Sequence, residues 1–154
     1  MEKIWRIFKN DKPEGKGTIY WNNGSWYDRN WVNGLKEGKG IYFYPNGDRY
    51  EGDFKHGINE GRGIIYWKSW LKYEGDWKNG IKEGKGIIYY IDGSRYGGDF
   101  QKEMIEGKGV MYYKNGDRYE GDFKNNKKEG KGTLYLSNGK VKQGNWKNNK
   151  YKAK

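Results

Sequence analysis

The chain has 154 residues, a formal net charge of +11 and no cysteine, which excludes a disulfide framework and thiolate metal sites. No stretch approaches the length of a membrane span, so we expect no transmembrane segment. The first residues show no long apolar run and no cleavage site, so we predict no secretory signal and a cytoplasmic location. Aromatic residues make up 18% of the chain and glycine contributes 26 residues, which favours an all-β structure without a thick core.

A 23-residue unit repeats along the chain without insertion or deletion. Position 5 of each unit is aromatic, position 11 is Glu in the six full units, and positions 12 and 14 are Gly in the same six. These units form one predicted repeat domain over residues 4–154. The six full units and a final half unit begin at Ile4, Tyr27, Tyr50, Tyr73, Tyr96, Tyr119 and Lys142.

Positions 1–6 and 11–18 of each unit read as strands, because side chains alternate between the faces of a strand. A four-residue loop between them places Lys55 opposite Glu60 and Asp53 opposite Arg62, both pairs of opposite charge. In the sixth unit, the same register pairs Lys124 with Glu129 and Asp122 with Lys131. Repeated pairs of this kind determine the register of the strands more than they contribute to the stability of the fold.

The connection from one unit to the next predicts a three-residue hairpin loop with glycine in the left-handed conformation, as at Gly47. This loop places Ile65 opposite Tyr73, and Gly63 opposite Gly75. The predicted fold is therefore a single elongated, twisted antiparallel β-meander of stacked hairpins, with about 13 strands.

The segment Gly80-Ile-Lys-Glu-Gly84-Lys85-Gly86 is similar at first sight to a phosphate-binding loop. Its spacing is one residue short of that motif, no helical period follows it, and it recurs in every full unit. We therefore interpret the glycines as architecture: they make room for bulky aromatics such as Trp77 on the neighbouring strand.

The unit Y-E-G-D-[FW]-K-N-G-x-x-E-G-x-G resembles the MORN (membrane occupation and recognition nexus) repeat over essentially the whole chain. The resemblance implies stacked hairpins and a non-catalytic scaffold or adaptor within a larger assembly, with a cytoskeletal, ciliary or axonemal setting. MORN arrays are also associated with phospholipid binding. The chain departs from the pattern at Arg6 and Arg29, which replace Gly at position 3, and at Trp70, where the turn glycine is missing.

Nothing in the sequence predicts catalysis, a cofactor or a metal site. His56 is the single histidine, at a turn position. The recurrent Asp and Glu residues each lie opposite a basic residue in the predicted register, so salt-bridged ladders explain them better than acid–base pairs.

Two kinds of protein-binding residue are predicted. The aromatic rows either form the core or line a groove for a helix, a peptide or a second MORN array, and such a groove contains Tyr50, Phe54, Tyr73, Trp77, Tyr96, Phe100, Tyr119 and Phe123. The variant turn with Trp67, Trp70 and Leu71 either folds Trp70 back on its neighbour or presents it to a partner.

The alternative function is a peripheral membrane module that binds anionic phospholipids such as phosphoinositides, because the chain is strongly basic. Single-stranded nucleic acid is a weaker alternative, since most bases are paired with carboxylates in the predicted register. The expected lipid-binding lysines are Lys82, Lys127, Lys128, Lys150, Lys152 and Lys154.

Overall fold

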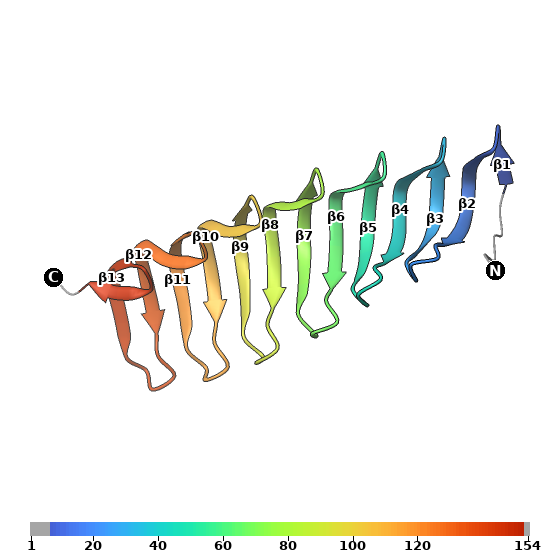
Figure 1. The fold of residues 1–154 in the computed structure, drawn as a ribbon. Helices are drawn as coiled ribbons and strands as arrows, with labels where there is room; N and C mark the ends of the chain where they lie inside the picture. Colours follow the sequence, from blue (N-terminus) through green and yellow to red (C-terminus); the bar gives the residue numbers. More distant parts are fainter. Residues whose placement is uncertain (1–6, 153–154) are drawn as a thin grey trace. The chain divides into compact units, whose positions relative to one another are not determined.

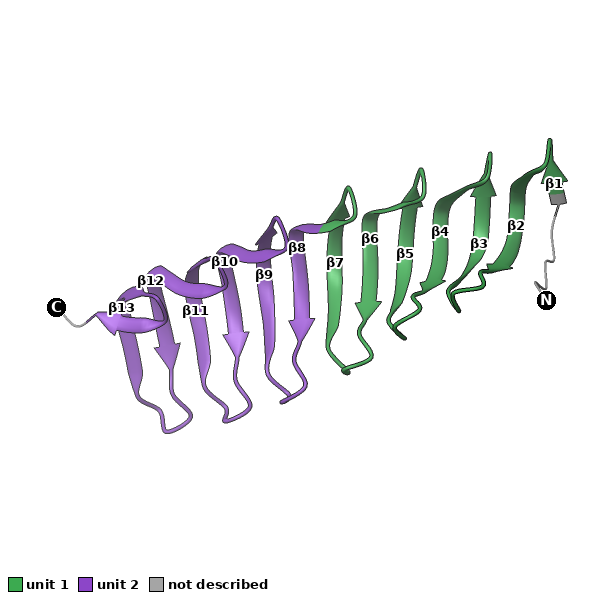
Figure 2. Cartoon of the chain, viewed as in Figure 1, with its two compact units in different colours: residues 1–81 green, residues 82–154 purple. Residues whose placement is uncertain are grey.

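A computed structural model describes residues 7–152 (Figure 1), so Ile4, Arg6 and Lys154 lie outside the described residues. The chain divides into two compact units, residues 1–81 and 82–154 (Figure 2). The described residues contain fourteen strands and no helix. Within each unit, consecutive strands pair antiparallel in chain order, which confirms the predicted all-β meander of hairpins.

The strands alternate between short and long along most of the chain. Unit 1 contains β1 (Ile7–Lys9), β2 (Lys12–Tyr20), β3 (Trp26–Val32), β4 (Leu35–Phe43), β5 (Arg49–Lys55), β6 (Ile58–Tyr66) and β7 (Lys72–Lys78). β8 (Ile81–Tyr89) begins at the boundary, and unit 2 continues with β9 (Arg95–Gln101), β10 (Met104–Tyr112), β11 (Arg118–Lys124), β12 (Lys127–Tyr135), β13 (Val141–Lys147) and β14 (Lys150–Lys152).

The turn inside each repeat has two residues, so the predicted four-residue loop is wrong. Lys55 pairs with Ile58, and His56 and Gly57 between them have φ angles of 50° and 84°. Positive φ at both central residues defines the turn type that matches the twist of a β-hairpin. The predicted partner Glu60 therefore does not lie opposite Lys55, and likewise Lys124 pairs with Lys127 rather than with Glu129.

A β-bulge then restores the predicted register further along the same hairpin. The pairing shifts between Gly52 and Phe54, beyond which Gly52 lies opposite Gly63 and Tyr50 opposite Ile65, as expected. Gly61 has a φ of +69° at this irregularity, a conformation that favours glycine. This geometry accounts for the glycine at position 12.

The glutamate at position 11 stabilises the turn of the following repeat. The Glu60 carboxylate accepts a hydrogen bond from the backbone N–H of Asn79 at 2.8 Å. All six full repeats have this contact at 2.8–3.0 Å, which explains the invariant glutamate: Glu14–Asn33, Glu37–His56, Glu60–Asn79, Glu83–Lys102, Glu106–Asn125 and Glu129–Asn148.

Replacing Glu60 with alanine should lower the free energy of unfolding by about 1 kcal/mol, because the Asn79 N–H loses its acceptor. Urea denaturation followed by tryptophan fluorescence measures this loss. Glu51→Ala is the matched control, since within residues 7–152 its carboxylate forms one ion pair, with the half-exposed Arg49 at 3.9 Å, and its loss should cost less than about 0.5 kcal/mol. Equal losses in the two variants would contradict the role assigned to Glu60.

The connection between repeats is the predicted three-residue loop. The Tyr44 N–H donates to the Asp48 carbonyl at 2.9 Å, and Gly47 has a φ of +93°. Ile65 lies opposite Tyr73 and Gly63 opposite Gly75, so this part of the register is confirmed.

In the five repeats that begin with tyrosine, this residue forms the centre of the core. Its hydroxyl donates to the backbone carbonyl three residues later, as from Tyr50 to Asp53 at 3.0 Å. The ring makes edge contacts with aromatics at position 5, here Phe54 and Trp77 at centroid distances of 5.0 and 5.1 Å. Five such tyrosines have no exposed surface: Tyr27, Tyr50, Tyr73, Tyr96 and Tyr119.

The glycine at position 14 leaves space for this tyrosine. A Cβ atom on Gly63 would overlap the Tyr50 ring and hydroxyl, and Gly40, Gly109 and Gly132 stand in the same relation to their tyrosines. The prediction that glycine makes room for a neighbouring aromatic ring is correct. The ring that needs this glycine is the tyrosine at position 1, whereas the sequence suggested the aromatic at position 5.

Candidate functional site

The face opposite the aromatic core, called here the polar face, carries a row of ion pairs beside the bulges. Arg62 pairs with Asp76 at 3.0 Å, while its backbone N–H donates to Asp53 at 3.1 Å. The base at position 13 thus lies between the aspartates of both neighbouring strands, as predicted. In unit 2, a hydrogen bond from Lys108 lowers the pKa of Asp122 below its usual range.

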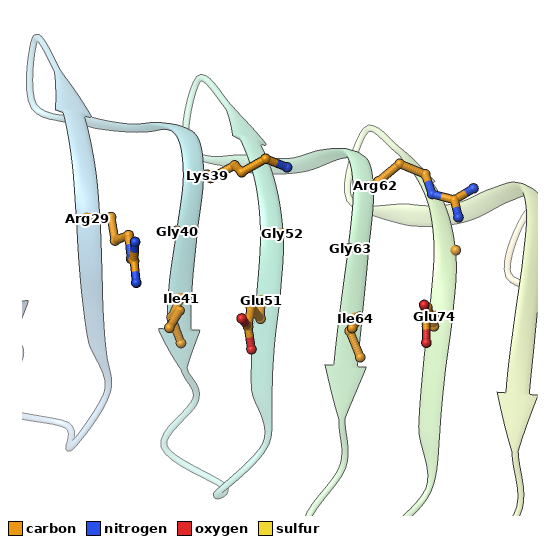
Figure 3. A pocket seen from close by; sticks show the side chains of 11 residues that line it. Arg29, Lys39, Gly40, Ile41, Glu51, Gly52, Arg62, Gly63, Ile64 and Glu74 are labelled. Atoms are coloured by element: carbon orange, nitrogen blue, oxygen red, sulfur yellow. The ribbon is translucent and has the colours of Figure 1, made fainter.

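A trough, called here the glycine trough, runs along the polar face of unit 1. The backbone of glycine residues forms its floor, and its cavity volume is about 370 Å³. Figure 3 shows Ile41, Glu51, Ile64 and Glu74 along one side, with Lys39 and Arg62 at the level where their strands bend sharply. The floor consists of Gly40, Gly52, Gly63 and Gly75.

The glycines of the floor are required by the packing on the other face. The glycine Cα atoms turn toward the core, where tyrosine hydroxyls occupy the space of a side chain. The walls combine aliphatic side chains with ion-paired charges. This combination suits an extended segment whose side chains alternate between apolar and polar.

Arg29 closes one end of the glycine trough and occupies a position that is usually glycine. Its φ of 120° is rare for a residue with a side chain, and its side chain remains 59% exposed. A core-facing side chain at position 3 would collide with the backbone of the neighbouring strand and with the tyrosine hydroxyl, as a Cβ on Gly52 shows. The sequence marked Arg29 as a departure from the repeat but not as part of a surface trough.

Unit 2 contains an equivalent trough with a cavity volume of about 400 Å³. Its lining comes from β11, β12 and β13, in the same register as in unit 1. The residues are Glu120, Gly121, Lys131, Gly132, Thr133, Gln143, Gly144 and Asn145. The trough is therefore a property of the repeat.

The eight aromatics predicted to line a groove lie in the core. Their exposed fractions range from 0% for the tyrosines to 6% for Trp77. A side chain without exposed surface offers none to a partner, so the structure supports the other interpretation, that these rows form the core.

The variant turn keeps the three-residue geometry without its glycine. The Trp67 N–H donates to the Leu71 carbonyl at 2.9 Å, and Trp70 takes a φ of 69° at the position where Gly47 has 93°. The Trp70 side chain is 88% exposed, so it does not fold back on its neighbour. Its role in docking a partner stays a prediction.

Trp70→Gly should raise the free energy of unfolding by about 1 kcal/mol, because glycine adopts this left-handed conformation without steric cost. Thermal denaturation measures the change. The double variant Trp70→Gly/Leu71→Asp should remain folded and capture less partner protein. Undiminished capture by the folded double variant would refute a docking role for this turn.

The six predicted lipid-binding lysines are not equivalent. Lys82 is only 12% exposed and pairs with Glu103 at 2.7 Å. Lys128 lies over the Trp146 ring at 4.7 Å, and burial lowers its pKa. The exposed members are Lys127, Lys150 and Lys152.

Residues 7–152 contain no cluster of three or more His, Cys, Asp or Glu residues suited to a metal ion. His56 is exposed in its two-residue turn, with Nδ1 3.8 Å from the Glu37 carboxylate. No helix in the described part of the chain is long and apolar enough to cross a membrane.

The fold and this surface define a β-hairpin repeat protein, in which an array of repeated turns and core tyrosines supports an open polar face. The MORN repeat model matches residues 7–26, 30–49, 50–72, 73–95, 96–118 and 119–141. The chain therefore belongs to the MORN repeat family, which confirms the resemblance. Among curated proteins, no sequence matches it.

Several solved structures have a similar fold, among them the following two. One is the TCP10 domain of Danio rerio CPAP in complex with a peptide of STIL, with a TM-score of 0.55, 11% identity and 92% of this chain covered. The other is the SAS-4 (dCPAP) TCP domain of Drosophila melanogaster with a proline-rich motif of Ana2, with a TM-score of 0.50, 17% identity, and coverage of 95% of this chain and 90% of that one. This chain spans 62% of the zebrafish chain. At these identities the likeness concerns the fold alone.

Proposed function

We propose that this protein is a non-catalytic adaptor that holds an extended segment of a partner protein in the glycine trough. The observation that carries the proposal is an open trough across β4, β5, β6 and β7 with a backbone floor and mixed apolar and charged walls. Protein segments in extended conformation present alternating side chains to such walls. The two structures of similar fold, each in complex with a peptide of another protein, support this proposal by analogy.

The proposal includes a larger assembly as the setting, with a cytoskeletal or ciliary location on the basis of the family resemblance. Trp70 and Leu71 are proposed as a second contact, because an exposed Trp gains most from burial in an interface. A second MORN array is an alternative partner for the same trough.

Affinity purification with an Ile41→Arg/Ile64→Arg variant tests the proposal. Both side chains line the glycine trough, so a partner retained by the wild type should be lost by the variant. Ile58→Arg is the matched control, since Ile58 is 47% exposed and does not line the trough. Circular dichroism checks that all three proteins are folded.

A partner retained equally by the trough variant would overturn the proposal. Co-sedimentation with liposomes tests the alternative function, phospholipid binding. Binding that requires anionic lipid, weakens with salt and depends on Lys127, Lys150 and Lys152 would favour the phospholipid alternative instead.

A further inference from the structure

A second regularity on the polar face pairs a base with an acid two residues later on the same strand. Lys72 lies 3.0 Å from Glu74, and Arg118 lies 3.1 Å from Glu120. Arg49 is 3.9 Å from Glu51, and its guanidinium lies 4.3 Å from the centre of the Tyr66 ring. Each of these bases thus has its own carboxylate.

Strand β9 breaks this pairing. Arg95 has the position of the base, but Gly97 stands where β5, β7 and β11 have glutamate. The Arg95 guanidinium lies over the Tyr112 ring at 4.5 Å, as Arg118 lies over Tyr135. Within residues 7–152, no carboxylate lies within ion-pair distance of Arg95.

The missing glutamate leaves a gap between two apolar side chains. Gly97 lies opposite Ile87 on β8 and opposite Val110 on β10. A Cβ on Gly97 would meet only an Ile87 methylene, at an ordinary 3.7 Å, and the φ of Gly97 does not require glycine. The backbone would therefore accept the glutamate of the other repeats.

We infer that Arg95 and the gap at Gly97 receive a Glu or Asp side chain from an extended segment of a partner protein. The guanidinium is held in place by Tyr112 and can donate to a carboxylate in two parallel hydrogen bonds. Ile87 and Val110 would contact the apolar residues two positions to either side of that acid. The net charge of +11 favours an acidic partner.

This inference rests on the proposed adaptor function, because its ligand is a protein segment. The gap lies in unit 2 and the glycine trough in unit 1, so synthetic peptides can test the gap alone. If the peptides fail to bind at the gap, the proposal for the glycine trough is not affected. Variants of the trough, in turn, should not change peptide binding at the gap.

The test is an NMR titration of the ¹⁵N-labelled full chain with acetyl-Val-Thr-Glu-Thr-Val-amide. The Glu peptide should shift the Arg95 Nε–H and Gly97 N–H signals, and its Gln analogue should bind about tenfold more weakly. Absence of these shifts up to roughly 5 mM peptide, or equal binding of both peptides, would overturn the inference.

Three variants sharpen the result. Gly97→Glu restores the internal pair, so it should keep the fold and abolish peptide binding, and wild-type binding by this variant would overturn the inference. Arg95→Gln should remove the preference for the Glu peptide. Glu120→Gly should create a second gap beside Arg118, with new shifts of the Arg118 Nε–H signal on titration.

Discussion

Gly63→Ala is expected to lower the free energy of unfolding by about 3 kcal/mol, because an added methyl group has no space in this core. The new Cβ would overlap the hydroxyl and ring of Tyr50, whose side chain has no exposed surface and cannot move into solvent. Urea denaturation followed by tryptophan fluorescence measures the loss.

Gly93→Ala separates this clash from the conformational freedom of glycine. Gly93 has a φ of +88° but nothing within 4 Å of an added Cβ, so alanine there should cost only about 1 kcal/mol. Equal losses at Gly63 and Gly93 would mean that the tyrosine does not dictate the glycine at position 14.

Tyr119→Ala should cost about 3–5 kcal/mol, the range for removing a large aromatic from a core. The Tyr119 ring contacts Phe123 and Trp146 at centroid distances of 5.2 and 5.1 Å, and its hydroxyl donates to the Asp122 carbonyl at 3.1 Å. Burial raises the pKa of Tyr119 to about 12, which reflects the same dry environment.

Tyr119→Phe is the control, since it removes the hydroxyl alone and should cost about 1 kcal/mol. Hydrogen exchange should show that Tyr119→Ala reduces protection first in β11, β12 and β13, because repeats depend on their nearest neighbours. Uniform loss of protection across unit 2 would contradict this local dependence.

The faces and most of the register were predictable from the sequence. The 23-residue period and the alternation of Tyr50, Gly52 and Phe54 with charged residues define the two faces without any structure. The three-residue loop followed from Gly47 and its counterparts, because glycine marks the left-handed position.

The two-residue turn and the bulge were missed for a physical reason. Pairing Lys55 with Glu60 satisfied charge complementarity, but the carboxylate instead accepts the N–H of Asn79, which is near only once the array is built. A bulge carries no charge signature, and the Asn–Gly dipeptides Asn33-Gly34 and Asn79-Gly80 were the available signal for a two-residue loop.

Less of the candidate site could be predicted from the sequence. The aromatics attract attention because they are unusual, yet in a thin sheet they are needed as the core. The glycine trough depends on how the strand backbone packs against the core tyrosines, which the repeat pattern alone does not display. The gap at Gly97 was detectable only by comparing position 2 across repeats, where Gly97 replaces the acid while Arg95 keeps the base.

In the proposed adaptor, the aromatic face forms the core and the polar face binds a partner protein. Amide hydrogen exchange of this chain, alone and in complex with its co-purified partner, separates the roles of the two faces. Added protection should fall on the strand segments that form the glycine trough, residues 39–41, 51–52, 62–64 and 74–75. Protection confined to the two-residue turns, with none in the trough segments, would contradict this proposal.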